Sequence, residues 1–438
     1  MSGCGLAPLS GQQSQTATRH EAVLFYTGEY MAEIRLLSEI IWREDLYPRF
    51  EANQALIQRY AYAIEYLPPI KISQQNILID GFHRWKAHQL NGETSIKVAI
   101  IQVESEQELK RLAYQLNSNH GLQLSNDEKR RYAQEMIGVM TVKELSVVLS
   151  VDESTINRWT ETQRKNLEEE RNRKIMELYL RAWNTQEAIG EMMGVEQNTI
   201  GRIIQKMQIQ EMDKDFAPPL YNIWNLQKQD SATDSHFGSF PLYFMKSLLH
   251  YHTEPLDIVF DPFAGGGTTV DACKTMLRRY YCTDKLVKPG REKDILQHDI
   301  VNGLPDGLPK PALVFLDPPY WTLAKKEYSE DANDLGNMTR DEFIQTMAIL
   351  ANQINSRKIN KIAYLIRPIW EIGGDAGWQW VDPMLEFYDA VKEHYRVSCR
   401  YVIPYSTQQY TGLWVDRAKK EQKCLILNRE LAIFERVK

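Results

Sequence analysis

Hydrophobic and polar positions alternate with different periods along the chain. Residues 24–138 mix helix-like stretches with short apolar runs typical of strands, which predicts a small α+β domain. The helix-like stretches lie at 54–67 and 105–117, and the strand-like runs at 68–72, 76–80 and 96–103. Residues 1–23 show neither period, so we expect a disordered tail there and no signal peptide.

Three regions follow this domain. Residues 139–210 are predicted to be helical, because charged stretches separate amphipathic segments and no strand-like run occurs. Prolines and polar residues then break the periodicity over 211–236, which indicates a linker. In 237–438 the apolar runs "DIVFDPF", "RYYCTD", "ALVFLDPP" and "KIAYLIRP" are separated by helix-sized segments. This alternation predicts an α/β fold with a Rossmann-like, mostly parallel sheet covered by helices on both faces.

Composition narrows the function classes. The chain has 438 residues, 43% of them hydrophobic and 25% charged, which is typical of a soluble protein too long for one core. Its net charge of -6 means that any DNA contact must come from local basic patches. The five cysteines lack C-x-x-C spacing, so we expect no disulfide framework, no metal site and a cytoplasmic location. No apolar stretch has the length of a membrane span, so we expect no membrane partner.

A glycine-rich turn between a strand and a helix is the first candidate site. In "DPFAGGGTT" the glycines let a ligand approach the backbone, and the helix start offers free N–H groups. Asp284, at the end of the next strand, could accept hydrogen bonds from ribose hydroxyls, and Asp299 could contact an adenine amino group. Alone, such a loop can also be a simple tight turn. The candidate cofactor residues are Asp261, Pro262, Phe263, Ala264, Gly265, Gly267, Thr268, Asp284 and Asp299.

The second candidate is "LDPPYW", directly after an apolar run. Together, "DPFAGGGTT" and "LDPPY" resemble the S-adenosylmethionine-dependent amino-methyltransferases of DNA, in the order of their γ class. The segments "FGSFP" and "VIPYSTQQYTG" resemble the parts of these enzymes that precede the cofactor loop and line the base pocket. The gap between the two motifs leaves no room for a target-recognition insert. The resemblance implies the catalytic residues Asp317, Pro318, Pro319 and Tyr320.

The chemistry of an exocyclic amino group explains this motif. Its lone pair is delocalised, so Asp317 and the carbonyl of Pro318 would accept its two N–H bonds and aim the nitrogen at the methyl group. Tyr320 would stack on a base rotated out of the helix. Trp321 and the segment after it, with Lys325 and Lys326, are expected to form a mobile loop that closes over the site. The alternative, in which Asp317 caps a helix and the prolines end a strand, fits a motif that follows a cofactor loop less well.

The front domain carries a box of its own. "GFHRWKA" resembles the G-x-x-R-x-x-A box of the ParB/sulfiredoxin superfamily, with Gly81, Arg84 and Ala87 in the defined places and His83 beside them. These residues could form a phosphate-binding corner for a CTP-like nucleotide, or a solvated helix face. The arginine of a downstream ParB segment falls at His120 or is lost, and no cysteine lies near Gly81 for sulfiredoxin chemistry.

The helical region holds two helix-turn-helix candidates. "TQEAIGEMMGVEQNTIGRIIQKM" places Gly194 in the turn, and "TVKELSVVLSVDESTINRWTETQRK" has Ser150 at that point. Their second helices would present Asn157, Arg158, Asn198 and Arg202 to DNA. Two hairpins used only for packing are the alternative.

The sequence therefore predicts a ParB-like domain fused to a site-specific methyltransferase acting on double-stranded DNA. Adenine N6 is preferred over cytosine N4, because "DPPY" is the form more familiar from adenine enzymes; cytosine C5 is disfavoured, because no Pro-Cys pair occurs. The alternatives are a non-catalytic ParB-like partition or regulatory protein, and methylation of RNA or of a protein amide. The oligomeric state stays open, with a homodimer among the options.

Overall fold

The computed structural model describes residues 33–47, 52–119, 124–210, 216–225, 240–321, 331, 333–373, 377–404 and 410–437. The chain forms two compact units, residues 1–167 and 168–438. The boundary falls inside helix α7 (Glu161–Leu180), so the helical segment expected over 139–210 is divided between the units. The expected tail at 1–23 and the residue His120 lie outside the described ranges.

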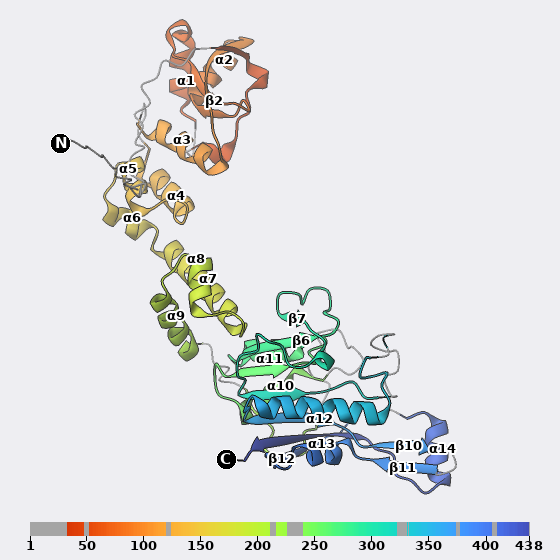
Figure 1. Ribbon diagram of the computed structural model, residues 1–438. Coiled ribbons are helices and arrows are strands. Elements are labelled where there is room, and N and C mark those ends of the chain that lie inside the picture. Colours follow the sequence, from red (N-terminus) through yellow and green to blue (C-terminus); the bar gives the residue numbers. More distant parts are fainter. Residues whose placement is uncertain are drawn as a thin grey trace, which may run out of the picture. The chain divides into compact units, whose positions relative to one another are not determined.

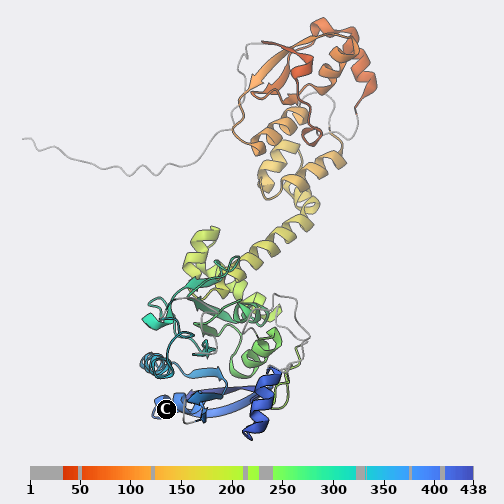
Figure 2. The same ribbon diagram turned by 90° about the vertical axis from the view of Figure 1, so that its right-hand side faces the viewer.

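The first unit contains a four-stranded sheet and a set of helices (Figures 1 and 2). Its strands, in the order β1-β4-β2-β3, are β1 (Glu33–Leu36), β4 (Ser95–Ile101), β2 (Ile70–Ser73) and β3 (Leu78–Asp80). Its helices are α1 (Gln54–Tyr62), α2 (Phe82–Leu90), α3 (Glu106–Asn119), α4 (Asn126–Met136), α5 (Val142–Leu149) and α6 (Glu153–Trp159), with short 3-10 turns at Leu37–Glu39, Glu44–Leu46 and Ile64–Tyr66. The α+β pattern predicted for this region is present.

The second unit is built on a seven-stranded sheet in the order β12-β13-β9-β8-β5-β6-β7. The strands are β5 (Ile258–Asp261), β6 (Arg279–Asp284), β7 (Ile295–Gln297), β8 (Leu313–Leu316), β9 (Lys361–Ile366), β12 (Tyr395–Pro404) and β13 (Asn428–Arg436). Strands β5 to β9 run parallel, whereas β13 is antiparallel to both β9 and β12. The mostly parallel sheet predicted from the apolar runs is confirmed.

Helices and one hairpin complete this unit. They are α8 (Gln186–Met193), α9 (Gln197–Gln210), α10 (Leu242–His252), α11 (Thr268–Thr275), α12 (Arg340–Ser356), α13 (Pro383–Val391) and α14 (Gly412–Lys420), a 3-10 turn at Ile300–Asn302, and the hairpin of β10 (Ile369–Gly373) and β11 (Gly377–Val381). Among the described residues no helix is long and apolar enough to cross a membrane.

Alternate strand residues pack on opposite faces of the sheet. On β5, Val259 joins the apolar cluster that contains residues of α10 and α11, while Phe260 joins the cluster that contains residues of α12 and α13. On β8, Phe315 joins the cluster of α10 and α11, and Leu316 joins the cluster of α12 and α13. Because β5 and β8 are buried on both faces, each reads as a continuous apolar run, and their acidic residues appear where the strand ends.

The helix-turn-helix candidate at residues 185–207, formed by α8 and α9, shares the core of this unit. Ile189 of α8 and Ile200 of α9 are fully buried in the same cluster as Val259. Arg181 forms a β-bridge to Tyr280 and an ion pair with Asp294 at 3.1 Å. These helices are therefore an integral part of the unit that carries the sheet.

Candidate active site

Three carboxyl groups lie at one edge of the large sheet. Asp261 is the last residue of β5, Asp284 the last of β6, and Asp317 directly follows β8. Strand β5 pairs in parallel with both β6 and β8, so all three acids lie at the carboxyl edge of neighbouring strands. Ligands of open α/β sheets bind in the crevice outside that edge.

Asp261 holds the glycine-rich loop in shape. Its carboxylate accepts hydrogen bonds from the Phe263 N–H at 2.9 Å and the Thr269 hydroxyl at 2.5 Å. Burial raises the pKa of Asp261 to about 7, against the effect of these two donors. Because both of its oxygens accept hydrogen bonds from the loop and from the start of α11, Asp261 stabilises the shape of the loop.

The loop itself turns sharply before α11. The N–H of Ala264 donates to the Thr283 carbonyl, and the N–H of Gly267 donates to the Ala264 carbonyl. Pro262 and Ala264 are buried, while Phe263 and Thr268 are half-buried. Gly267 has φ +89°, a left-handed backbone conformation that favours glycine, and a Cβ there would displace the Arg291 guanidinium, which would lie 2.9 Å away.

Gly265 and Asp284 join the loop to the second acid. The Gly265 N–H donates to Asp284 Oδ2 at 2.7 Å, and the Leu286 N–H donates to Oδ1 at 3.0 Å. A Cβ on Gly265 would meet only the Phe263 carbonyl oxygen, at 3.8 Å, so there is space beside this turn. Burial raises the pKa of Asp284, and its two backbone donors oppose that rise. Each Asp284 oxygen keeps a lone pair for another donor.

Asp299 is engaged by its neighbours. It accepts a hydrogen bond from the Val301 N–H at 3.1 Å and forms an ion pair with Lys285 Nζ at 3.2 Å. Lys285 also contacts Asp331 at 2.7 Å. A ligand amino group at Asp299 would therefore share the carboxylate with Lys285.

Asp317 lies beside an arginine from the other end of the domain. Arg429 of β13 places Nη1 3.5 Å from Asp317 Oδ2, and each side chain is only 14% exposed. Burial raises the pKa of Asp317 to about 6, and the Arg429 charge lowers it. The carboxyl group is thus largely ionised at neutral pH, although it is almost enclosed.

The rest of the turn brings an aromatic ring to the same edge. Pro318 is buried, and Pro319 and Tyr320 are half-buried. The guanidinium of Arg367, the residue after β9, lies 5.9 Å from the centre of the Tyr320 ring. Arg367 Nε is buried and has no hydrogen-bond partner among the described residues. Acid, ring and two arginines therefore gather around the ends of β8 and β9.

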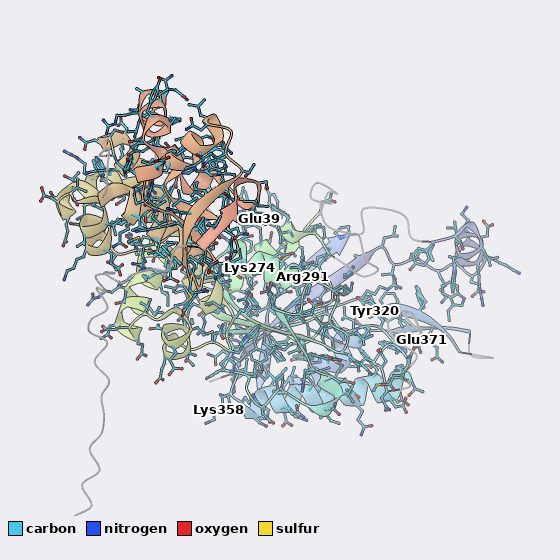
Figure 3. The ribbon with its side chains drawn as sticks, turned by 90° about the horizontal axis from the view of Figure 1, so that it is seen from above. Glu39, Lys274, Arg291, Tyr320, Lys358 and Glu371 are labelled. Atoms are coloured by element: carbon cyan, nitrogen blue, oxygen red, sulfur yellow. The ribbon has the colours of Figure 1, made fainter. Side chains whose placement is uncertain are left out.

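Trp321 does not belong to a mobile loop as expected, because its side chain is fixed. It is 1% exposed, packs on Phe343 with ring centroids 5.0 Å apart, and donates from Nε1 to Glu371 Oε1 at 2.6 Å. Glu371 belongs to β10, so this bond joins the turn of Tyr320 to the hairpin. Tyr320 and Glu371 are labelled in Figure 3. Lys325 and Lys326 lie outside the described residues.

The two helix-turn-helix candidates have the predicted geometry. Ser150 and Gly194 end their first helices in the left-handed conformation, with φ of +51° and +63°. Arg158, Asn198 and Arg202 are exposed. The half-buried Asn157 accepts a hydrogen bond from Arg164 within its own hairpin.

The ParB-like box is tied to its own domain. Gly81 has φ +103° at the start of α2, and Ala87 is buried. Arg84 donates to the carbonyl oxygens of Pro68 and Pro69 and to Asp80, at 2.8 to 3.0 Å. His83 Nε2 accepts from the Asn53 N–H at 3.1 Å. In this conformation Arg84 directs its donors at protein acceptors.

Sequence reasoning missed Arg429, Arg367 and the hairpin. Arg429 is remote from "DPPY" in sequence and meets Asp317 only because β13 inserts antiparallel beside β9. Arg367 in "KIAYLIRP" does follow an apolar run, as Asp317 does, and this signal was readable. Residues 237–239 of "FGSFP" and 405–409 of "VIPYSTQQYTG" lie outside the described ranges, so neither segment is placed as a whole.

The covered sheet, with the glycine-rich loop and the acids at one edge, is a Rossmann-like α/β fold. A family described as DNA methylase matches residues 32–287, more than half of the chain, and the protein belongs to this family. The matched range includes the glycine-rich loop and Asp284 and ends before Asp317.

Individual relatives match over shorter lengths. The Type II methyltransferase M.XycI of Xanthomonas campestris pv. cyanopsidis is 37% identical over 59 residues, 14% of this chain and 19% of that protein. The chain thus matches about a fifth of the length of this curated relative.

Solved structures match each part of the chain at low identity. The chromosome-partitioning protein ParB of Caulobacter crescentus, complexed with CTP-gamma-S, is 13% identical with a TM-score of 0.19, over 30% of this chain and 76% of that one. The 1,6-didemethyltoxoflavin-N1-methyltransferase of Burkholderia thailandensis is 11% identical with a TM-score of 0.29, over 45% and 78%. A SAM-dependent methyltransferase of Archaeoglobus fulgidus is 11% identical with a TM-score of 0.27, over 45% and 95%. At these scores the similarities carry no argument about function.

Proposed function

We propose that this protein is an S-adenosylmethionine-dependent DNA methyltransferase that modifies an exocyclic amino group, adenine N6 in preference to cytosine N4. One observation carries the proposal: the nearly enclosed Asp317 lies at the same sheet edge as the loop that Asp284 ties to Gly265. Amino methylation requires a carboxylate that accepts the amino N–H beside a site for the nucleoside part of the cofactor. Membership of the DNA methylase family supports DNA as the substrate.

The residues at the loop fit the cofactor. Open space at Gly265 leaves room for a ligand against the backbone, and the free lone pairs of Asp284 suit two ribose hydroxyls. Asp299 would meet the adenine end of the ligand in competition with Lys285. S-adenosylmethionine supplies an electrophilic methyl group on a sulfonium when bound.

The "DPPY" turn would hold the substrate amino group. Asp317 accepts one N–H and the Pro318 carbonyl accepts the other, which draws the nitrogen toward tetrahedral geometry. With a pKa of about 6, Asp317 is ionised at neutral pH and can take the proton that the nitrogen loses. Arg429 keeps the carboxyl group charged, and Tyr320 offers its ring to the extruded base.

The partners of the front regions form part of the same proposal. The exposed Arg158, Asn198 and Arg202 would contact double-stranded DNA from the two helix-turn-helix segments. A CTP-like nucleotide at Gly81 would have to draw Arg84 away from Pro68 and Pro69. We include a homodimer in the proposal because a two-fold symmetric protein would suit DNA targets made of paired half-sites. A location in the reducing cytoplasm is also part of the proposal.

Transfer of a tritiated methyl group to DNA, RNA and protein fractions tests this proposal. We expect label in DNA, and digestion to nucleosides followed by mass spectrometry distinguishes N6-methyladenine from N4-methylcytosine. Asp317→Ala should lose about a hundredfold to a thousandfold in rate with cofactor affinity retained, because the acid faces substrate. An active Asp317→Ala enzyme, or label confined to RNA or protein, contradicts the proposal.

A further inference from the structure

The hairpin β10–β11 and helix α14 meet in a cluster of tryptophans. The rings of Trp370 and Trp380 are 5.0 Å apart, and those of Trp378 and Trp414 are 5.8 Å apart. Trp370 Nε1 donates to the Cys424 carbonyl at 2.8 Å, which fixes the hairpin to the segment after α14. We define these four tryptophans, together with Lys419, Lys420 and Lys423, as the tryptophan surface.

This surface lies at the same edge of the sheet as Asp317. Strand β10 begins just after β9 ends, and α14 leads into the start of β13, which pairs with the end of β9. The bond from Trp321 to Glu371 connects the hairpin directly to the turn that holds Tyr320. Any molecule that reaches Tyr320 from this side therefore passes the hairpin.

Exposure and charge indicate what the surface contacts. Trp380 is 51% exposed and Trp414 37%, so the cluster leaves ring surface open to solvent. Lys419 and Lys420 are exposed and have no carboxylate partner in the described parts of the chain. Lys423 lies 5.2 Å from the centre of the Trp370 ring. Lys419 and Lys420 share helix α14 with the exposed Trp414. Cations close to open rings match an anionic partner that also offers flat rings.

We propose that the tryptophan surface binds the DNA strand next to the target base. Lys419 and Lys420 neutralise phosphates, and Trp380 stacks on a base beside the gap that opens when the target is extruded. The inference rests on the proposed function, because it requires DNA at the Asp317 edge. It assigns DNA contacts to the catalytic unit itself, in addition to those of the helix-turn-helix segments.

The test uses the full chain and a short fluorescent DNA duplex. Lys419→Gln combined with Lys420→Gln should weaken binding and lower the slope of log Kd against log salt concentration by about 1 to 2, since each lost phosphate contact removes about 0.9. The matched control combines Lys310→Gln with Lys358→Gln. These exposed lysines precede β8 and β9, at the opposite edge of the sheet; Lys358 is labelled in Figure 3. The control should keep the wild-type slope.

Trp380→Ala should raise the Kd for DNA by about fivefold to a hundredfold, the effect of one lost stack. Trp380→Phe should retain most of the affinity, because a ring face survives. Cofactor affinity and Tm should be unchanged in every variant, which excludes general unfolding as the cause.

Several results would overturn the inference. One is a salt slope for the Lys419 and Lys420 variant equal to that of the Lys310 and Lys358 control. Another is unchanged DNA binding with altered self-association in sedimentation, which would identify a protein interface. Failure of the proposed function looks different: the wild type would bind DNA with the predicted slope but transfer no methyl group. A wild type that methylates DNA while the variants bind normally would refute the surface alone.

Discussion

Replacing Arg429 by glutamine should move the acid limb of the pH–rate profile to higher pH. In the proposed mechanism Asp317 must be ionised to accept the amino N–H. Its pKa of about 6 combines the rise caused by burial with the reduction caused by Arg429. Opposite charges this close interact by about 4 kcal/mol at an effective dielectric constant of about 20. Because each side chain keeps 14% exposure and glutamine can still donate a hydrogen bond, we expect a displacement of about 1 pH unit.

The measurement is single-turnover methyl transfer from pH 5 to 9 with saturating cofactor. At about pH 6.5 the variant should be about threefold slower than the wild type, and near pH 8.5 the two should converge. Arg429→Lys, which keeps the charge, is the matched control. Asp261 also titrates in this range, and the charge of Asp317 contributes to raising its pKa, so the displacement reports on these two coupled acids. Identical acid limbs for the wild type and Arg429→Gln would refute this reasoning.

Three further predictions concern stability and binding. Asp317→Asn should raise the free energy of unfolding at pH 8 by up to about 3 kcal/mol, because the folded pKa of Asp317 is raised from 3.8 to about 6. A group with a raised pKa contributes stability below pH 3.8 and loses it as the pH rises through 6, so the gain in Tm should shrink to about a fifth near pH 4; an equal gain at both pH values would argue against it. Asp284→Ala should weaken S-adenosylmethionine binding by about tenfold, measured by calorimetry, and unchanged affinity would remove Asp284 from the site. A fragment that begins at Asp215 should melt well below one that begins at Glu168, because it lacks the buried Ile189 and Ile200; equal Tm values would contradict the shared core.

Residues close together in sequence determined much of the site. The run that becomes β5, the turn after it and the start of α11 are contiguous, so the loop from Asp261 to Gly267 was predictable from its glycines and its apolar flank. Asp284 and Asp317 were predictable because a strand buried on both faces seldom holds an acid except at its ends. Ser150 in a helix-turn-helix turn was readable from spacing alone, and the structure gives it the left-handed conformation that the motif requires.

Pairing between distant strands decided the rest. Arg429 reaches Asp317 across 112 residues of chain because β13 runs antiparallel to β9, and no local pattern specifies that register. Glu371 holds Trp321 because a hairpin leaves the sheet at the same edge, so Trp321, which was expected to begin a mobile loop, is buried and anchored. In the sequence, helices α8 and α9 look like an independent module, because an amphipathic pattern shows which face of a helix is buried but not which element covers it. Only the packing of Ile189 and Ile200 into the cluster of Val259 assigns them to the catalytic unit.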